Sequence, residues 1–327
     1  MPELEQLALN NTSFSNTTQL GGPYAIYGAD YSAAGNIAMT SGTPLKLNDI
    51  SKNPNLIKSS DIFMSGVYSL GEVLRDNGYN LEIIMGSDGT FGNRKQYYEC
   101  NGNYKVFDLN YAITTGRMTE ADQVWWGFSD DYLYSWSKDE IVNLASQDKP
   151  FNYILVTADT HFTDGYLSPY AEKKYPSQYE NVHAYASKLA NDFIDWVKSQ
   201  DFYENTTIVI VGDHLGMQNN FYLDRAQGNY PRTIYNVFIN DVLGTTNIHN
   251  RIFTSYDIYP TILASIGVKI EGNRLGLGTN LYSDTPTIPE ELGIENFNNE
   301  LKKNSKYYNE QIMGDEYYRY KKEYSNS

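Results

Sequence analysis

Asp213 and His214 are the residues in this chain whose types and order point most directly to chemistry. They follow a strongly β-branched stretch, residues 207–211, and precede the turn Leu215-Gly216. A carboxylate and an imidazole in tandem suit a hard or borderline divalent ion such as Mn²⁺, Mg²⁺ or Zn²⁺. An isolated pair of this kind is more often an aspartate that caps the next segment beside a surface histidine. The pair therefore needs partners from elsewhere in the chain to indicate a site.

Ser32 begins a short predicted helix, residues 32–41, which ends at Gly42. A serine at a helix start most often caps the helix, and local sequence alone favours that interpretation. The same position would place a nucleophilic oxygen at the positive end of the helix dipole, where an alkoxide or a phosphate is stabilised.

Two loops carry groups that could bind a phosphoryl oxygen. In the first, residues 159–166, His161 could bind such an oxygen or protonate a leaving group. The second, residues 88–94, joins a glycine-rich turn that begins at Asp88 to Arg94, whose guanidinium could hold a phosphate in a fork. Either loop could instead be ordinary connecting structure.

The elements that must position these residues alternate between strands and helices. An amphipathic helix at residues 180–199 separates two predicted strands, which is the order found in parallel sheets. We therefore expect an α/β fold with a mostly parallel central sheet and helices on both faces. The predicted strands are residues 81–85, 153–157, 207–211 and 236–239.

Ligands of open α/β sheets bind beyond the carboxyl ends of the strands. Polar segments follow three of the predicted strands, at residues 85–88, 159–161 and 212–214, so we expect them to converge into one site. The sequence becomes polar after Gly278. We expect one catalytic domain at residues 1–282 and a smaller, partly helical C-terminal appendage at residues 283–327.

The composition excludes several classes of function. With 327 residues, 41% of them hydrophobic and 20% charged, the chain is expected to fold as a globular protein. Its formal net charge of -15 argues against a nucleic-acid partner, so a phosphate substrate would need a local metal ion, arginine or helix N-terminus. No apolar run approaches the ~20 residues of a membrane span, so we expect any anchor or export signal to lie outside this sequence.

Taken together, these segments resemble the phosphoglycerol-transferase branch of the alkaline phosphatase–sulfatase superfamily. The resemblance is strongest to the members that modify glucans or cell-wall polysaccharides, and it covers about residues 1–282. The motifs that carry it are Tyr31-Ser32-Ala33-Ala34-Gly35, Gly42-Thr43-Pro44-Leu45, residues 159–168, Asp213-His214, residues 257–263 and Gly276-Leu277-Gly278.

The resemblance implies metal-dependent transfer of glycerol phosphate from phosphatidylglycerol to a cell-envelope glycan, with Ser32 as the nucleophile that carries the phosphoryl group. It implies that Ser32, Asp213 and His214 bind a divalent metal, expected to be Mn²⁺. Arg94, His161 and Asp88 would contact the substrate, and His161 would also assist catalysis by moving a proton. The implied location is the extracytoplasmic face of a bacterial membrane, with the full-length protein anchored by segments outside this chain.

Three departures from the family pattern qualify these expectations. The family usually has Thr where this chain has Ser32, which retains the hydroxyl. Lipoteichoic acid synthases carry a His and a Trp where this chain has Met85 and Gly92, which disfavours polymer synthesis. The family's first metal ligand is an acidic residue at the end of a strand upstream of a segment like residues 1–7, so we expect that first strand and one metal carboxylate to lie outside this sequence.

Two alternatives remain open. The first is a sulfatase or phosphatase of the same superfamily. Sulfatases have x-Pro-x-Arg after the nucleophile, whereas residues 33–36 lack both the Pro and the Arg. The second is a glycan-binding domain whose catalytic site has decayed.

Overall fold

The computed structural model describes residues 1–52, 57–59, 62–225 and 231–324 of the chain. Its strands form three sheets, and all four predicted strands are confirmed. One sheet is parallel with strand order β2-β1-β3, one is the antiparallel pair β4-β5, and one is the short hairpin β6-β7. The bounds are β1 Asn80–Met85, β2 Lys105–Phe107, β3 Phe151–Val156, β4 Ile208–Val211, β5 Asn236–Ile239, β6 Arg274–Leu275 and β7 Gly278–Thr279.

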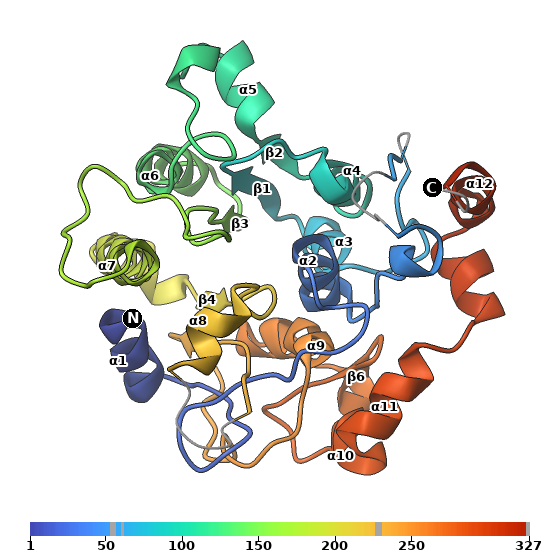
Figure 1. Cartoon of the computed structure of the whole chain (residues 1–327). Coiled ribbons are helices and arrows are strands. Elements are labelled where there is room, and N and C mark those ends of the chain that lie inside the picture. Colours follow the sequence, from blue (N-terminus) through green and yellow to red (C-terminus); the bar gives the residue numbers. More distant parts are fainter. Residues whose placement is uncertain (53–56, 60–61, 226–230, 325–327) are drawn as a thin grey trace.

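Helices cover both faces of the parallel sheet, as predicted (Figure 1). Successive residues of β1 point to opposite faces, and nearly all of them are buried because helices pack on each side. The longer helices are α1 Pro2–Asn10, α2 Ser32–Ser41, α3 Leu70–Asp76, α4 Arg94–Cys100, α6 Asp130–Ala145, α7 Gln178–Lys198, α9 Ser255–Ser265, α11 Ile294–Leu301 and α12 Asp315–Tyr324. The shorter ones are α5 Leu109–Thr114, α8 Asn219–Leu223 and α10 Ile288–Leu292. None of the helices in the described part of the chain is long and apolar enough to cross a membrane.

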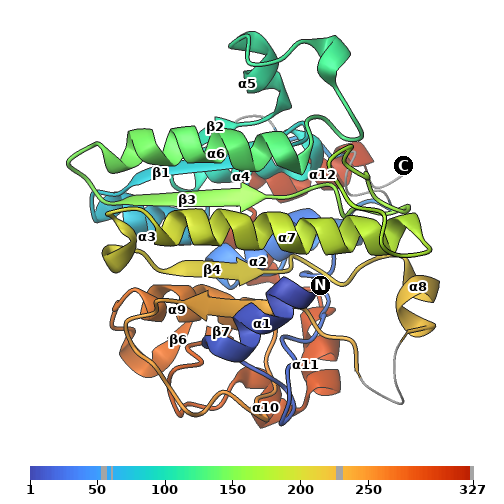
Figure 2. The ribbon, with the colours of Figure 1, turned by 90° about the vertical axis from the view of Figure 1, so that its left-hand side faces the viewer.

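A gap separates the parallel sheet from the β4-β5 pair. β3 and β4 run in the same direction, with α7 packed across them, but no ladder of hydrogen bonds joins them among the described residues (Figure 2). Every residue of β3 and β4 is only half-buried, whereas the residues of β5 are all buried. A cavity of about 2360 Å³ extends along both strands to Ser32 and Asp213. The expected central sheet is therefore present in two parts.

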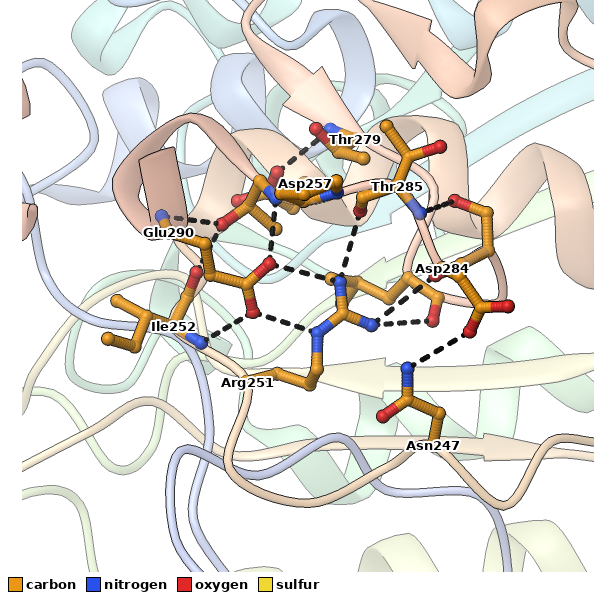
Figure 3. Close-up of polar contacts among 12 residues, drawn as sticks. Asn247, Arg251, Ile252, Asp257, Thr279, Asp284, Thr285 and Glu290 are labelled. Atoms are coloured by element: carbon orange, nitrogen blue, oxygen red, sulfur yellow. Dashed lines mark hydrogen bonds and ion pairs between the residues drawn. The ribbon is translucent and has the colours of Figure 1, made fainter. Parts of the chain in front are cut away.

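The C-terminal segment is held to the rest of the chain by a buried ion pair between Arg251 and Glu290 (Figure 3). Next to this pair, the Asp257 carboxylate at the start of α9 accepts the backbone N–H groups of Thr254 and Thr279. Helix α11 also packs its apolar side chains into a cluster with residues 26–38 and Tyr256. The segment after residue 282 contains the helices α10, α11 and α12, and its treatment as a separate appendage with a boundary at residue 282 stays a prediction.

Candidate active site

Ser32 is the first residue of α2, and its Oγ lies 3.1 Å from Nε2 of His214. Tyr31 occupies the cap position before the helix, and no side chain caps it in the part of the chain that the structure describes. The local interpretation of Ser32 as a helix cap is therefore wrong, because its hydroxyl faces His214 instead. The uncapped N–H groups of a ten-residue helix leave a positive potential beside this hydroxyl.

Gly35 lets α2 approach the loop after β4. A Cβ atom at this position would lie 2.0 Å from the carbonyl oxygen of Asp213, so no larger residue fits without moving the backbone. The first turn of α2 is also held by Asn36, which donates to the Ser32 carbonyl and accepts from the Tyr98 hydroxyl. These contacts bring Ser32 together with Asp213 and His214, residues that are far apart in the sequence.

His214 has a defined tautomer in this arrangement. Its Nδ1 lies 2.8 Å from the carbonyl oxygen of Leu215, and a carbonyl only accepts, so Nδ1 carries the proton. Nε2 therefore presents its lone pair toward Ser32. Asp213 Oδ1 accepts the backbone N–H of His214 and lies 3.8 Å from Nε2. The His214 side chain is 10% exposed and that of Asp213 is 35% exposed, so both are reachable from the cavity.

These three side chains fit part of a divalent-metal site. They supply two kinds of oxygen donor and one imidazole nitrogen, which suits Mn²⁺ or Zn²⁺. The described residues contain no group of three or more His, Cys, Asp or Glu that could hold a metal. The described residues thus offer a partial ligand set.

Arg94, at the start of α4, is a buried cation in the same cavity. Its Nε donates to the carbonyl of Phe91, and its Nη2 donates to Ser87 Oγ and to the carbonyl of Asp88. Nη1 has no hydrogen-bond partner among the described residues, and no carboxylate there pairs with the guanidinium. Burial lowers the pKa of Arg94, while the negative charge of Asp213 opposes that shift. An arginine stays protonated, so this site holds a positive charge with free donors.

Asp88 and His161 lie in the loops where the sequence predicts them. The Asp88 carboxylate accepts the backbone N–H of Thr90, which stabilises its own turn. His161 Nδ1 lies 2.7 Å from the Phe162 carbonyl, so Nδ1 carries the proton and Nε2 is available as an acceptor. Both residues line the cavity that also contains Ser32 and Arg94. Their roles in binding substrate and, for His161, in catalysis stay predictions.

A buried carboxylate pair holds the His161 loop, and the sequence analysis did not identify it. Asp130, the first residue of α6, accepts the N–H groups of Ala158 and Asp159, and Asp159 in turn accepts the N–H of Asp130. Burial is the main cause that raises the pKa of Asp159 to about 8. The motif at residues 159–161 therefore combines a structural carboxylate with an imidazole at the cavity.

One further residue at the cavity was also missed. The Trp126 ring lies 5.1 Å from the ring of His161, whereas Ser87, which holds Arg94 through its hydroxyl, lies in the segment 85–88 that the sequence analysis included. The adjacent tryptophans Trp125 and Trp126, in a polar stretch of the sequence, are the signal that could have identified this part of the cavity wall.

Comparisons with known proteins agree with this geometry. The sulfatase family matches residues 1–268. Phosphoglycerol transferase I of Citrobacter koseri is 29% identical over 241 residues, which cover 70% of this chain and 30% of that protein. The lipoteichoic acid synthase LtaP from Listeria monocytogenes superposes with a TM-score of 0.65 at 18% identity, covering 86% of this chain and 69% of that one. The C-terminal periplasmic domain of EcEptC from Escherichia coli, solved in complex with Zn, superposes with a TM-score of 0.51 at 12% identity, covering 90% and 88%.

These similarities differ in what they show. The two solved structures, at such low identity, show the fold. The chain spans less than a third of the length of the curated relatives it matches. The family match covers most of the chain, including Ser32, Arg94, His161, Asp213 and His214. The chain therefore belongs to the sulfatase family of the alkaline phosphatase–sulfatase superfamily and is distantly related to phosphoglycerol transferases.

Proposed function

We propose that this protein transfers glycerol phosphate from phosphatidylglycerol to a glycan of the cell envelope, through a phosphoryl group carried on Ser32. The observation that carries the proposal is the 3.1 Å approach of Ser32 Oγ to His214 Nε2 at the uncapped start of α2. The similarity to phosphoglycerol transferase I supports this donor. The lack of Pro and Arg in residues 33–36 argues against a sulfate ester as the substrate.

The first step forms a bond between Ser32 Oγ and the phosphorus of the lipid and breaks the bond from phosphorus to the diacylglycerol oxygen. The Ser32 proton passes to solvent water, and the diacylglycerol oxygen takes a proton from Nε2 of His161, which is the proposed donor and is protonated before this step. Negative charge that develops on the phosphoryl oxygens is stabilised by Arg94 and by the N–H groups at the start of α2.

In the second step a hydroxyl oxygen of the glycan attacks the same phosphorus, and the bond from phosphorus to Ser32 Oγ breaks. The glycan hydroxyl gives its proton to Nε2 of His161, which regains the proton lost in the first step, and Ser32 takes a proton from solvent water. A divalent ion held by Ser32, Asp213 and His214, with Mn²⁺ as the proposed metal, would supply Lewis-acid chemistry that lowers the pKa of the Ser32 hydroxyl. Because the tautomer of His214 is set by Leu215, its Nε2 is available as a ligand without any rearrangement.

The gap between β3 and β4 supports the prediction that one metal carboxylate comes from outside this sequence. The two strands run in the same direction and have facing open edges, which usually carry a cost when they are left unpaired. An extended segment placed between them would pair with both, and its carboxyl end would reach the edge of the sheet at Asp213. We therefore propose that a strand from outside this sequence occupies the gap and ends in the acidic ligand.

The proposed location is the extracytoplasmic face of a bacterial membrane, where phosphatidylglycerol and envelope glycans are both accessible. The fold shared with a periplasmic domain supports it. The chain spans a minor part of its curated relatives, so any membrane anchor would belong to the rest of the protein.

Replacing Ser32 tests this function in the full-length protein with Mn²⁺ present. With labelled phosphatidylglycerol and an envelope glycan, we expect the wild-type protein to release diacylglycerol and to label the glycan. Ser32→Ala should abolish both, while Ser32→Thr, which keeps a hydroxyl, should retain measurable transfer. Release of diacylglycerol by Ser32→Ala at the wild-type rate would contradict the proposal. So would a wild-type protein that cleaves an aryl sulfate and leaves phosphatidylglycerol intact.

A further inference from the structure

A tight turn at residues 124–127 exposes two adjacent tryptophans beside the cavity. Val124 and Gly127 exchange both backbone hydrogen bonds, at 2.7 and 2.8 Å, so Trp125 and Trp126 form the tip of the turn. Trp125 has a φ of +50°, in the left-handed region that a bulky side chain rarely adopts. The side chains of the two tryptophans are 44% and 47% exposed. The chain therefore maintains a strained backbone and two solvent-facing indoles at one place.

The turn is fixed to the end of β1, directly before the loop that carries Arg94. Gly127 forms an isolated bridge with Ser87, and the N–H of Phe128 donates to the carbonyl of Gly86. A Cβ atom at Gly127 would lie 1.9 Å from that carbonyl oxygen, so the close approach requires glycine. Phe128, the residue after the turn, anchors it to the core because its ring is buried against Phe107 and Trp136. Strain in a segment held this firmly is typical of functional sites.

The exposed rings are linked by pairwise contacts along the wall of the cavity, which Phe91, Trp126 and Phe162 line. Trp126 lies 5.1 Å from the His161 ring and 6.3 Å from the Phe91 ring, and it also contacts Trp125. Phe91 in turn lies 5.9 Å from the guanidinium carbon of Arg94, and Phe162 packs against His161. The aromatic surface therefore consists of Phe91, Trp125, Trp126 and Phe162, all of which are exposed. It joins the two side chains proposed to hold the phosphoryl group.

The charges near this surface decide which partner it fits. The net charge of the chain is -15, and the segment just before the turn carries the exposed carboxylates Glu120 and Asp122. An anionic bilayer surface would be repelled by both. A neutral sugar has no charge to repel. Its C–H face packs on an indole, and its hydroxyls can donate to nearby carboxylates.

We propose that the aromatic surface at Phe91, Trp125, Trp126 and Phe162 is the subsite that binds a sugar ring of the neutral acceptor glycan. This inference rests on the proposed function and names the part of the cavity wall that selects the acceptor. A sugar packed on Trp126 lies next to His161 and Arg94, so one of its hydroxyls is directed toward the phosphoryl group on Ser32. The subsite adds no bond-making step to the reaction.

Binding to the chain itself tests the subsite without any turnover. The probe is an array of neutral hexose oligosaccharides, and the comparison is co-sedimentation with phosphatidylglycerol vesicles. We expect Trp126→Ala to weaken oligosaccharide binding about tenfold, with no change in vesicle binding, and Trp126→Phe to restore part of the loss. Tyr307→Ala, which removes an exposed ring in the C-terminal segment, is the matched control and should bind as the wild type does.

Trp125→Gly separates binding from stability. Glycine accepts the left-handed backbone, so this variant should raise Tm while it weakens oligosaccharide binding, a combination that a purely structural role would not produce. Unchanged oligosaccharide binding in Trp126→Ala would overturn the proposal. Loss of vesicle binding in place of oligosaccharide binding would also overturn it and would assign the surface to a membrane.

The same variants distinguish failure of the subsite from failure of the proposed function. Ser32→Ala should bind the oligosaccharides as the wild type does, because it leaves the aromatic surface intact. If the wild-type protein binds them through Trp126 but never releases diacylglycerol, the transferase proposal fails and the subsite stands. If diacylglycerol is released and Trp126→Ala transfers to the glycan with an unchanged KM, the subsite fails and the transferase proposal stands.

Discussion

Arg94 and Arg251 are nearly equally buried, with 7% and 6% of their surfaces exposed, but their surroundings are opposite in character. All the N–H groups of Arg251 have acceptors (Figure 3). Its Nε and Nη2 bind the two oxygens of Glu290, and its remaining donors bind the carbonyls of Leu281, Ser283 and Thr285. Arg251 is therefore a neutralised, fully bonded clamp between the segment before α9 and the C-terminal helices.

Arg94 has neither a carboxylate partner nor a complete set of acceptors among the described residues. Its three bound donors reach two carbonyls and one hydroxyl, all neutral, and Nη1 is free. A buried positive charge without a counter-ion is unfavourable unless an anion binds there. Two equally buried arginines therefore differ in whether a described carboxylate pairs with them, and the missing pair supports Arg94 as the proposed anion-binding residue.

Removing the clamp should have the largest effect on stability. Arg251→Met leaves Glu290 and three carbonyls without their donor, and we expect a loss of about 4 kcal/mol in the free energy of unfolding. Urea denaturation followed by circular dichroism measures it. A loss below about 1 kcal/mol would show that the clamp does not hold the C-terminal segment.

Removing Arg94 should reduce activity strongly and change stability little. In Arg94→Met, we expect transfer activity to fall by about 10²–10³-fold, because the phosphoryl oxygens lose a cation. The free energy of unfolding should fall less than in Arg251→Met, because two carbonyls and one hydroxyl lose their donor but no ion pair among the described residues is broken. Equal losses of stability in Arg94→Met and Arg251→Met would abolish the distinction between the two arginines.

Lysine at each position sharpens the comparison. At residue 94 the role is to supply charge, so Arg94→Lys should recover about tenfold of the activity lost in Arg94→Met. At residue 251 the role depends on a planar fork with several acceptors, so Arg251→Lys should recover little of the lost stability. Parallel activity and denaturation measurements on the four variants test this, and full recovery of stability by Arg251→Lys would contradict it.

The loss of stability at acidic pH should show the smallest difference between the two arginines. Burial alone would raise the pKa of Glu290, but hydrogen bonds from Arg251, Thr287 and Ile252 outweigh it, so the pKa lies below its ordinary value of 4.5. A lowered carboxyl pKa contributes stability above the unfolded-state value, and this contribution is lost as the pH falls through the folded-state value.

We therefore expect the wild type to lose more stability than Arg251→Met as the pH falls below the ordinary glutamate pKa of 4.5. Arg94→Met should follow the wild type, since no carboxylate is paired with Arg94. Chemical denaturation at a series of pH values measures these differences. If the free energy of unfolding of Arg251→Met falls with pH as steeply as that of the wild type, Arg251 does not stabilise the Glu290 carboxylate.

Much of the fold could be predicted from local sequence. The β-branched runs at residues 81–85 and 207–211 formed strands, and helix α7 follows its apolar periodicity. The division of the sheet into two parts could not be predicted, because strand pairing depends on neighbours in space. The late motif at residues 257–263 shows the same limit, since only the structure shows that Asp257 holds the start of α9 to β7.

The sequence by itself determined which side chains are available at the cavity and the α/β class of the fold. Local patterns placed Ser32 at a helix start and Asp213 and His214 after a strand, and the family resemblance implied that all three bind a metal. Only the tertiary structure decided that Ser32 faces His214, and that Arg251 is paired with a carboxylate whereas Arg94 has no such partner among the described residues. These facts depend on contacts between residues distant in the chain, such as the approach of Gly35 to Asp213, and no local pattern encodes them.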